Sequence, residues 1–182
     1  NTGTLVVQMT GNNEAADELS ILDNVVGTIN TDGTNLQDGA TVIGTLSSSE
    51  GTVTDGTALT ITLNSNATNA LVQELVRAIH YRNTSNNPGT SNRTVTYTVT
   101  DASGGTSNDA RVISVTAAND APTISIDAST LAYTENDAAT QIDAAATSSD
   151  ADGDADWNTG TLVVQMTGNN EAADELSILD NV

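Results

Sequence analysis

Several short segments of the chain alternate between apolar and polar residues. In the clearest, residues 93–100, Val95, Tyr97 and Val99 share one face and threonines fill the other. Strict alternation leaves one buried and one solvated face, which is typical of an antiparallel sandwich. Runs of similar composition predict further strands at residues 4–9, 58–63, 111–117, 121–126, 132–134 and 161–166.

One segment between two predicted strands has helical spacing instead. Leu71, Leu75 and Ile79 recur at every fourth position, which places them on one face of a helix. Thr68 or Asn66 is a suitable N-cap for its start. The pattern therefore predicts an all-β fold, an antiparallel β-sandwich with one short inserted helix over residues 68–79.

The chain contains an internal repeat. Residues 158–182 are identical to residues 1–25, at an offset of 157 residues. This identity indicates one full period of a tandem array plus an overlap, and the period is long enough for each repeat to be a whole domain. Pro122, which lacks an amide donor, suits a domain entrance. We therefore expect part of one repeat at residues 1–117, a linker at 118–121 and the opening of the next repeat at 122–182.

The charge of the chain narrows the classes of partner. Twenty-four acidic residues face four arginines, which gives a formal net charge of −20, and there is no cysteine. A nucleic-acid partner requires a basic surface, so it is not expected. No apolar run approaches the length of about 18 residues that a membrane span needs, so no membrane insertion is expected. The uncompensated acidic charge favours divalent cations as partners.

Residues 75–101 read LVRAIHYRNTSNNPGTSNRTVTYTVTD, the motif NDAP follows at 119–122, and AYTEN stands at 132–136. This combination resembles the cadherin-like tandem repeats of giant bacterial surface adhesins of the type I secreted, repeats-in-toxin class. The resemblance implies an Ig/cadherin-like sandwich that serves as a structural extender. It also implies an extracellular location on a Gram-negative cell surface, and Ca²⁺ at the junctions between domains.

The strongest candidate for metal binding is the acidic run 150–156, with Asp150, Asp152, Asp154 and Asp156 around Gly153. Ca²⁺ prefers several oxygen ligands, and carboxylates on a flexible turn can supply them. The alternative is a solvated acidic loop without metal.

The resemblance extends the candidate ligand set. Cadherin-type junctions combine a linker Asp, a Glu about 15 residues on and a DxD pair about 30 residues on; Asn119–Asp120, Glu135 and Asp150/Asp152 stand at those intervals. Asp101, at the end of a predicted strand, is either a turn former or a junction ligand. No DRE motif is present, so the complete ligand set of animal cadherins does not carry over. We interpret Asp17 and Glu18 as solvated turn residues.

Enzyme activity is not expected from this sequence. His80 is the sole histidine, and no Ser or Asp near it in the sequence completes a catalytic arrangement. Two alternatives to the extender stay open. A glycan- or surface-binding sandwich would be favoured by an exposed aromatic platform around Trp157, and a Ca²⁺-dependent enzyme fragment by a pocket with two carboxylates and a basic group.

The overlap of the repeat predicts how copies associate. Neighbouring identical repeats are the expected partners, because the C-terminal part of one chain matches the opening part of another. Residues 1–25 and 158–182 would then compete for equivalent positions in head-to-tail strand complementation.

Overall fold

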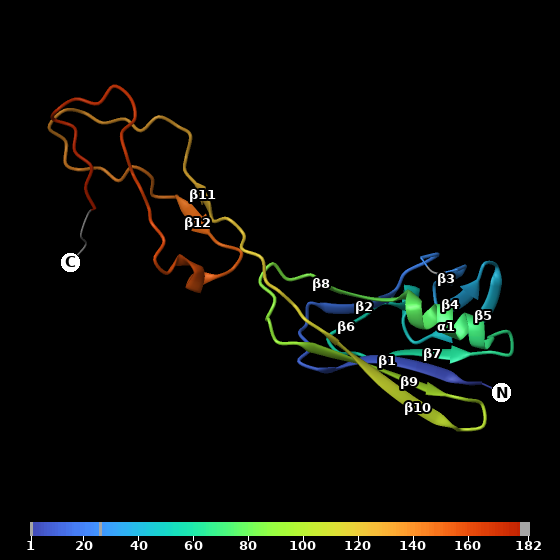
Figure 1. Ribbon diagram of the computed structural model, residues 1–182. Helices are drawn as coiled ribbons and strands as arrows, with labels where there is room; N and C mark the ends of the chain where they lie inside the picture. Colours follow the sequence, from blue (N-terminus) through green and yellow to red (C-terminus); the bar gives the residue numbers. More distant parts are fainter. Residues whose placement is uncertain (1, 26, 179–182) are drawn as a thin grey trace. The chain divides into compact units, whose positions relative to one another are not determined.

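The computed structural model describes residues 2–25 and 27–178 (Figure 1). They fall into two compact units, the N-terminal unit Asn1–Ala118 and the C-terminal unit Asn119–Val182. The division lies within the segment predicted as a linker. Residue 1 and residues 179–182 lie outside the described residues, so the two copies of the repeat are described at 2–25 and 158–178.

The N-terminal unit consists of antiparallel strands with one α-helix. In chain order its elements are β1 (Thr4–Gly11), β2 (Asp17–Ile21), β3 (Ile29–Asp32), β4 (Asn35–Asp38), β5 (Thr41–Leu46), the 3₁₀ turn η1 (Ser49–Gly51), β6 (Val53–Thr54), β7 (Leu59–Leu63), α1 (Asn69–Ala78), β8 (Ile79–Asn83), β9 (Arg93–Thr100) and β10 (Thr106–Ile113).

These strands form two sheets. The larger has the order β10-β9-β1-β7-β5-β4-β3, and the smaller has the order β6-β2-β8. β1 therefore lies inside the larger sheet, between β9 and β7, while the next strand, β2, lies at the centre of the smaller sheet (Figure 1). The first 21 residues thus supply an inner strand to each sheet.

One hydrophobic core joins both sheets and the helix. Leu5 and Val7 of β1, Leu19 of β2, Ile61 of β7 and Leu75 of α1 are at most 1% exposed and belong to one cluster. Alternate residues of β1 are buried, as expected for a strand that turns one face toward the core. The predicted all-β sandwich with a short helix is confirmed.

The helix forms where its apolar spacing predicts it. The Thr68 hydroxyl accepts a hydrogen bond from the Leu71 amide at 3.3 Å, so Thr68 caps the helix. Leu75 and Ala78 are buried against the core, and the helix ends where Ile79 begins β8. Within the described residues, no helix combines the length and apolar character that crossing a membrane requires.

The last strand of the N-terminal unit differs from its prediction. A strand was expected over residues 111–117, but β10 runs from Thr106 to Ile113. The tight turn after β9, with Gly104 at φ 90°, starts the pairing at Thr106 opposite Thr100. β10 is an edge strand with most of its residues exposed, so its first half needs no apolar pattern.

Residues 119–178, the described part of the C-terminal unit, have little regular structure. β11 (Thr123–Ser125) pairs with β12 (Thr147–Ser149), and the 3₁₀ turn η2 spans Asp154–Trp157. The prediction of a strand at 121–126 is confirmed in part by β11. The strands predicted at 132–134 and 161–166 are wrong, because neither segment pairs with another strand among the described residues.

Candidate metal centre

The acidic run after β12 is folded by two consecutive turns. The Gly153 amide donates to the Asp150 carbonyl at 3.2 Å, and the Asp156 amide donates to the Gly153 carbonyl at 3.1 Å. Gly153 joins the turns with φ 93° and ψ 179°, a conformation essentially restricted to glycine. The chain therefore folds back, and Asp156 returns toward Asp150.

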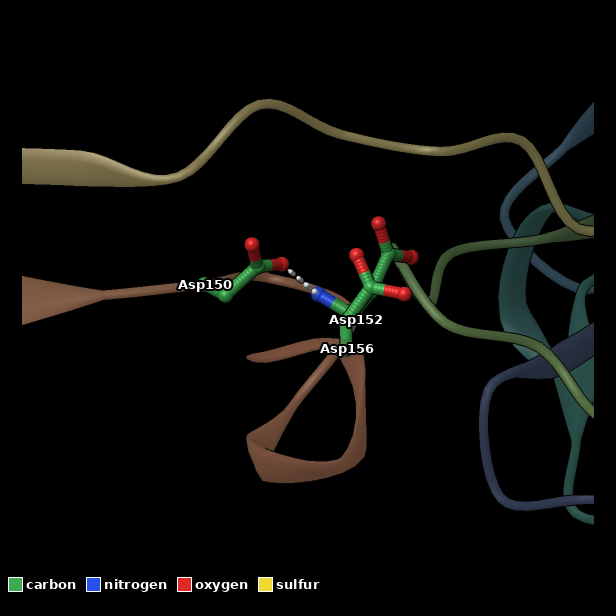
Figure 2. A group of neighbouring side chains, drawn as sticks. All are labelled: Asp150, Asp152 and Asp156. Atoms are coloured by element: carbon green, nitrogen blue, oxygen red, sulfur yellow. Dashed lines mark hydrogen bonds between the residues drawn. The ribbon is translucent and has the colours of Figure 1, made fainter. Parts of the chain in front are cut away.

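Three carboxylates converge on this turn (Figure 2). Asp150, Asp152 and Asp156 each offer one carboxylate oxygen, and these oxygens lie within 4.8 Å of one another. Asp150 and Asp152 are half-buried, whereas Asp156 is exposed. We call these three residues the aspartate triad.

Backbone hydrogen bonds connect the aspartate triad to the linker. The Asp152 amide donates to Asp150 Oδ1 at 2.9 Å, and the Asp120 amide donates to Asp152 Oδ2 at 2.6 Å. The Asn119 side chain donates through Nδ2 to the Asp120 carbonyl at 2.8 Å. The beginning of the C-terminal unit is thus held against its acidic turn, 32 residues further along the chain.

The donor set of the aspartate triad fits a hard divalent cation. Like charges separated by about 5 Å repel by about 1 kcal/mol per pair in water, and by several times more where solvent is partly excluded. A divalent cation removes this repulsion, and oxygen donors without His or Cys suit Ca²⁺ better than Zn²⁺. Within the described residues, the triad is the group of acidic side chains placed to hold one.

Among the predicted ligands outside the aspartate triad are Asp154 and Glu135. Asp154 begins η2 with an exposed side chain. Glu135 is exposed in a turn closed by a 3.0 Å hydrogen bond from the Asp137 amide to the Thr134 carbonyl. Asp156, which belongs to the predicted acidic run but not to the predicted ligand set, takes the third position. Gly153, in the middle of the acidic run, is the sequence feature that could have indicated that the chain folds back and brings Asp156 toward Asp150.

Asp101 belongs to the N-terminal unit, where it stabilises the turn between β9 and β10. Its Oδ1 accepts hydrogen bonds from the amides of Ser103 and Gly105, both at 2.8 Å. β10 then runs back for eight residues, so this turn lies at the opposite end of the β9–β10 hairpin from residues 114–118. The hydrogen bonds account for Asp101 as a turn former.

A second charged cluster is buried inside the N-terminal unit. Asp17 in β2 and Arg93 in β9 are both fully buried, and Arg93 Nε donates to Asp17 Oδ2 at 2.9 Å. Tyr81 and Asn83 of β8 donate to Asp17 Oδ1 at 2.6 and 2.7 Å. The Glu14 amide donates to Asp17 Oδ2 at 2.7 Å. The interpretation of Asp17 as a solvated turn residue is therefore wrong.

The guanidinium of Arg93 has further partners. Nη2 pairs with Glu14 Oε2 at 2.8 Å, and Nη1 donates to the Ser91 carbonyl. Glu18 follows Asp17 in β2. Its side chain is 12% exposed and forms an ion pair with Arg82 at 2.8 Å, so Glu18 is a strand residue with a charged partner. Asp17 and Arg93 therefore cross-link β2 and β9, which belong to different sheets.

Burial and hydrogen bonding compete at Asp17. Burial by itself raises the pKa of a carboxyl, but the hydrogen bonds that Asp17 accepts, first among them that from Tyr81, offset this and hold its pKa below the usual value. Burial and the hydrogen bond to Asp17 raise the pKa of Tyr81 to about 12. The network is thus an ionised carboxylate with a neutral phenol beside it.

The sequence contained one signal for this network. Arg93 is in phase with Val95 and Tyr97 on the inward face of the strand at 93–100, which places a cation inside the sandwich. A buried cation requires a buried counter-charge. The position of Arg93 in the alternating pattern does not identify which of the many acidic residues supplies this counter-charge.

Comparison with known proteins finds no matching family, no matching curated protein and no matching solved structure.

Proposed function

We propose that this chain is a structural extender of a bacterial surface adhesin, a spacer that Ca²⁺ stiffens at the entrance to each repeat. The observation that carries the proposal is the aspartate triad, to which the linker residue Asp120 is hydrogen-bonded through its amide. The identical segments at a spacing of 157 residues support a tandem array.

The N-terminal unit has properties that suit a spacer. Its sheets and helix enclose one hydrophobic core, and the Asp17–Arg93 pair cross-links strands of both sheets. A spacer needs a module that keeps its shape under load. In this proposal the distal adhesive domain lies elsewhere in the adhesin, and the repeats project it from the cell.

Calcium acts on the linker in this mechanism. Asp150, Asp152 and Asp156 would hold the ion, which supplies positive charge to a site that otherwise repels itself. Because Asp152 also accepts the hydrogen bond from the Asp120 amide, fixing Asp152 restrains the linker. Without the ion, the repulsion between the carboxylates would not be offset, and the linker would be less restrained.

The test compares two isosteric substitutions in the same acidic run. Asp152→Asn removes a triad carboxylate, whereas Asp154→Asn makes the same charge change outside the triad. Thermal melting and X-ray scattering with Ca²⁺ or a chelator are the measurements. At a hundredfold excess over the dissociation constant, Ca²⁺ adds roughly 2.7 kcal/mol to the state that binds it.

We expect Ca²⁺ to raise the melting temperature and narrow the distribution of molecular dimensions in the unsubstituted chain and in Asp154→Asn. Asp152→Asn should lose most of both effects. A chain whose melting and scattering are the same with Ca²⁺ and with chelator would contradict the proposal, as would equal losses in the two variants.

Exposed aromatic residues favour a second candidate, a glycan-binding module. Trp157, next to the aspartate triad, is 44% exposed, and Tyr133 is 60% exposed. Such rings can stack on sugars. Under this alternative, Trp157→Ala abolishes binding to a glycan array and leaves the response to Ca²⁺ unchanged, whereas the extender proposal expects no glycan binding by the unsubstituted chain.

A further inference from the structure

The chain enters β1 and leaves β10 at opposite ends of three neighbouring strands. β1 and β10 run in the same direction, because β9 lies between them and pairs antiparallel with both. Thr4, which begins β1, and Thr106, which begins β10, both pair with Thr100. Ile113, which ends β10, lies at the other end of β9, and residues 114–118 continue from there (Figure 1). Tension along the chain would therefore pull β1 and β10 in opposite directions along the strand axis.

This arrangement loads the hydrogen bonds between the strands in shear. The bonds of an antiparallel pair lie perpendicular to the strands, so a force along the strands is shared by all of them. Such a pair separates only when its hydrogen bonds break together. A force that pulls the same two strands apart from one end loads the first bond, then the next, and opens the pair one bond at a time. The sheared pair therefore resists a larger force.

The ladder between β9 and β10 is continuous. It runs from Thr106 opposite Thr100 to Ile113 opposite Arg93, over the eight residues of β10 and without a register shift. The hydroxyls of Thr100 and Thr106 are hydrogen-bonded to each other at 3.2 Å across the first pair. In the ladder between β1 and β9, by contrast, the register shifts just before Gly11. The β9–β10 ladder can thus bear load along its whole length.

β9 is anchored in the unit independently of β10. Val95 is 2% exposed in the hydrophobic core, and Arg93 is fully buried in its ion pair with Asp17 of the smaller sheet. β10 adds little to that core, because all of its residues except Ile113 are exposed. Apolar burial therefore accounts for β9 but not for the length of β10, whose distinctive property is that it moves the exit of the chain to the far end of the sheet.

We propose that β10 is a mechanical clamp: it makes tension on the N-terminal unit act in shear, and its separation from β9 is the barrier to forced unfolding. The use of such a clamp rests on the proposed function, because a spacer in an adhesin carries tension along its chain. Once β10 has separated, the chain leaves the sheet at Thr100, directly opposite Thr4. The same tension then opens β1 from β9 one pair at a time.

The first experiment applies force to the same fold through two pairs of attachment points. The chain has no cysteine, so two substituted cysteines define where the handles are attached. Thr2→Cys with Thr116→Cys pulls through β10 and is the shear pair. Thr2→Cys with Ser103→Cys is the control, because Ser103 lies in the turn before β10 and the force then opens β1 from β9 at one end. All three side chains are exposed and lie outside the strands.

Optical tweezers measure the lifetime of the folded unit at one constant force. Forced unfolding is governed by the unfolding rate, and we expect the shear pair to survive at least about tenfold longer than the control pair at the same force. Equal lifetimes, or a shorter lifetime of the shear pair, would overturn the proposal. All measurements are made with chelator present, so their outcome is independent of the proposed Ca²⁺ binding and tests the clamp separately from it.

Two proline substitutions test the ladder of β10 itself. The Ala110 amide donates to Asp109 Oδ1 at 2.8 Å and not to β9. Because the ladder donors of an antiparallel strand alternate, the Asn108 amide also points away from β9, whereas the Ser107 amide points toward it. Proline lacks an amide donor and is tolerated on an edge strand where that donor faces solvent. Ser107→Pro therefore removes a ladder hydrogen bond, and Asn108→Pro is its matched control.

In the shear pair, we expect Ser107→Pro to shorten the lifetime under force at least about tenfold, and Asn108→Pro to change it much less. In the control pair, which bypasses β10, neither substitution should change the lifetime. Circular dichroism checks that both variants keep the β-structure of the unit. Equal effects of the two prolines in the shear pair, or an unchanged lifetime for Ser107→Pro, would overturn the proposal.

Discussion

Replacing Asp17 with alanine tests the buried ionic network and has a control in the same chain. Asp17 is fully buried and accepts hydrogen bonds from four groups, whereas Asp174, in the identical sequence context, is exposed. The two substitutions Asp17→Ala and Asp174→Ala remove the same atoms from the same neighbours in sequence. Any difference between them therefore measures the tertiary environment.

The expected loss at Asp17 follows from what the substitution leaves behind. Arg93 stays fully buried with its remaining ion pair to Glu14, at 2.8 Å, and the donors on Tyr81 and Asn83 lose their acceptor. Breaking a buried pair from one side destabilises by about 3–5 kcal/mol. Since Glu14 still offsets part of the charge, we expect about 3 kcal/mol for Asp17→Ala and less than about 0.5 kcal/mol for Asp174→Ala.

Urea denaturation followed by far-ultraviolet circular dichroism is the assay, because most of the β-structure belongs to the N-terminal unit. Asp17→Ala should lower the midpoint strongly, and Asp174→Ala should leave it in place. Equal midpoints for the two variants would refute the account of Asp17 as the counter-charge of Arg93.

Three further predictions concern the pH dependence of stability and the acidic turn. The pKa of Tyr81 is raised to about 12, so its contribution to stability, about 2 kcal/mol, is complete below pH 10 and lost as pH rises from 10 to 12. Tyr81→Phe should flatten this alkaline decline in the free energy of unfolding, measured by urea titration. An unchanged decline in Tyr81→Phe would contradict the assignment to Tyr81. The pKa of Asp17 is lowered, so its contribution is present above pH 4 and lost as pH falls below it. Gly153→Ala should weaken the proposed Ca²⁺ binding at least tenfold in calorimetry, because φ 93° at this position disfavours alanine. The control Gly104→Ala, at φ 90° in the other unit, should leave Ca²⁺ binding unchanged. Equal effects of the two substitutions would contradict the role of the turn at Gly153.

Local periodicity was sufficient to predict the elements whose partners are also present. The spacing of Leu71 and Leu75 predicted α1, and the alternation around Val95 predicted β9, because each pattern matches one buried face. The same reasoning failed at residues 161–166. Their sequence is that of β1, but a strand exists only when another strand satisfies its amides and carbonyls.

The candidate site was predictable in part for a similar reason. The density of carboxylates around Asp150 and Asp152 is a property of sequence, and the structure brings these two together with Asp156. The burial of Asp17 is a property of tertiary structure. Three of its four donors lie 64 to 76 residues away along the chain, and no local pattern contains them.

The exposed outer edge of β10 would acquire a particular meaning in the proposed tandem array of repeats. Each module would present the same open row of backbone donors and acceptors, and matching edges are prone to zip together into aggregates. Asp109 and Arg111, both exposed on this strand, put a charge on the edge at alternate positions. Charged edge residues of this kind discourage such pairing, so crowded neighbours can stay separately folded.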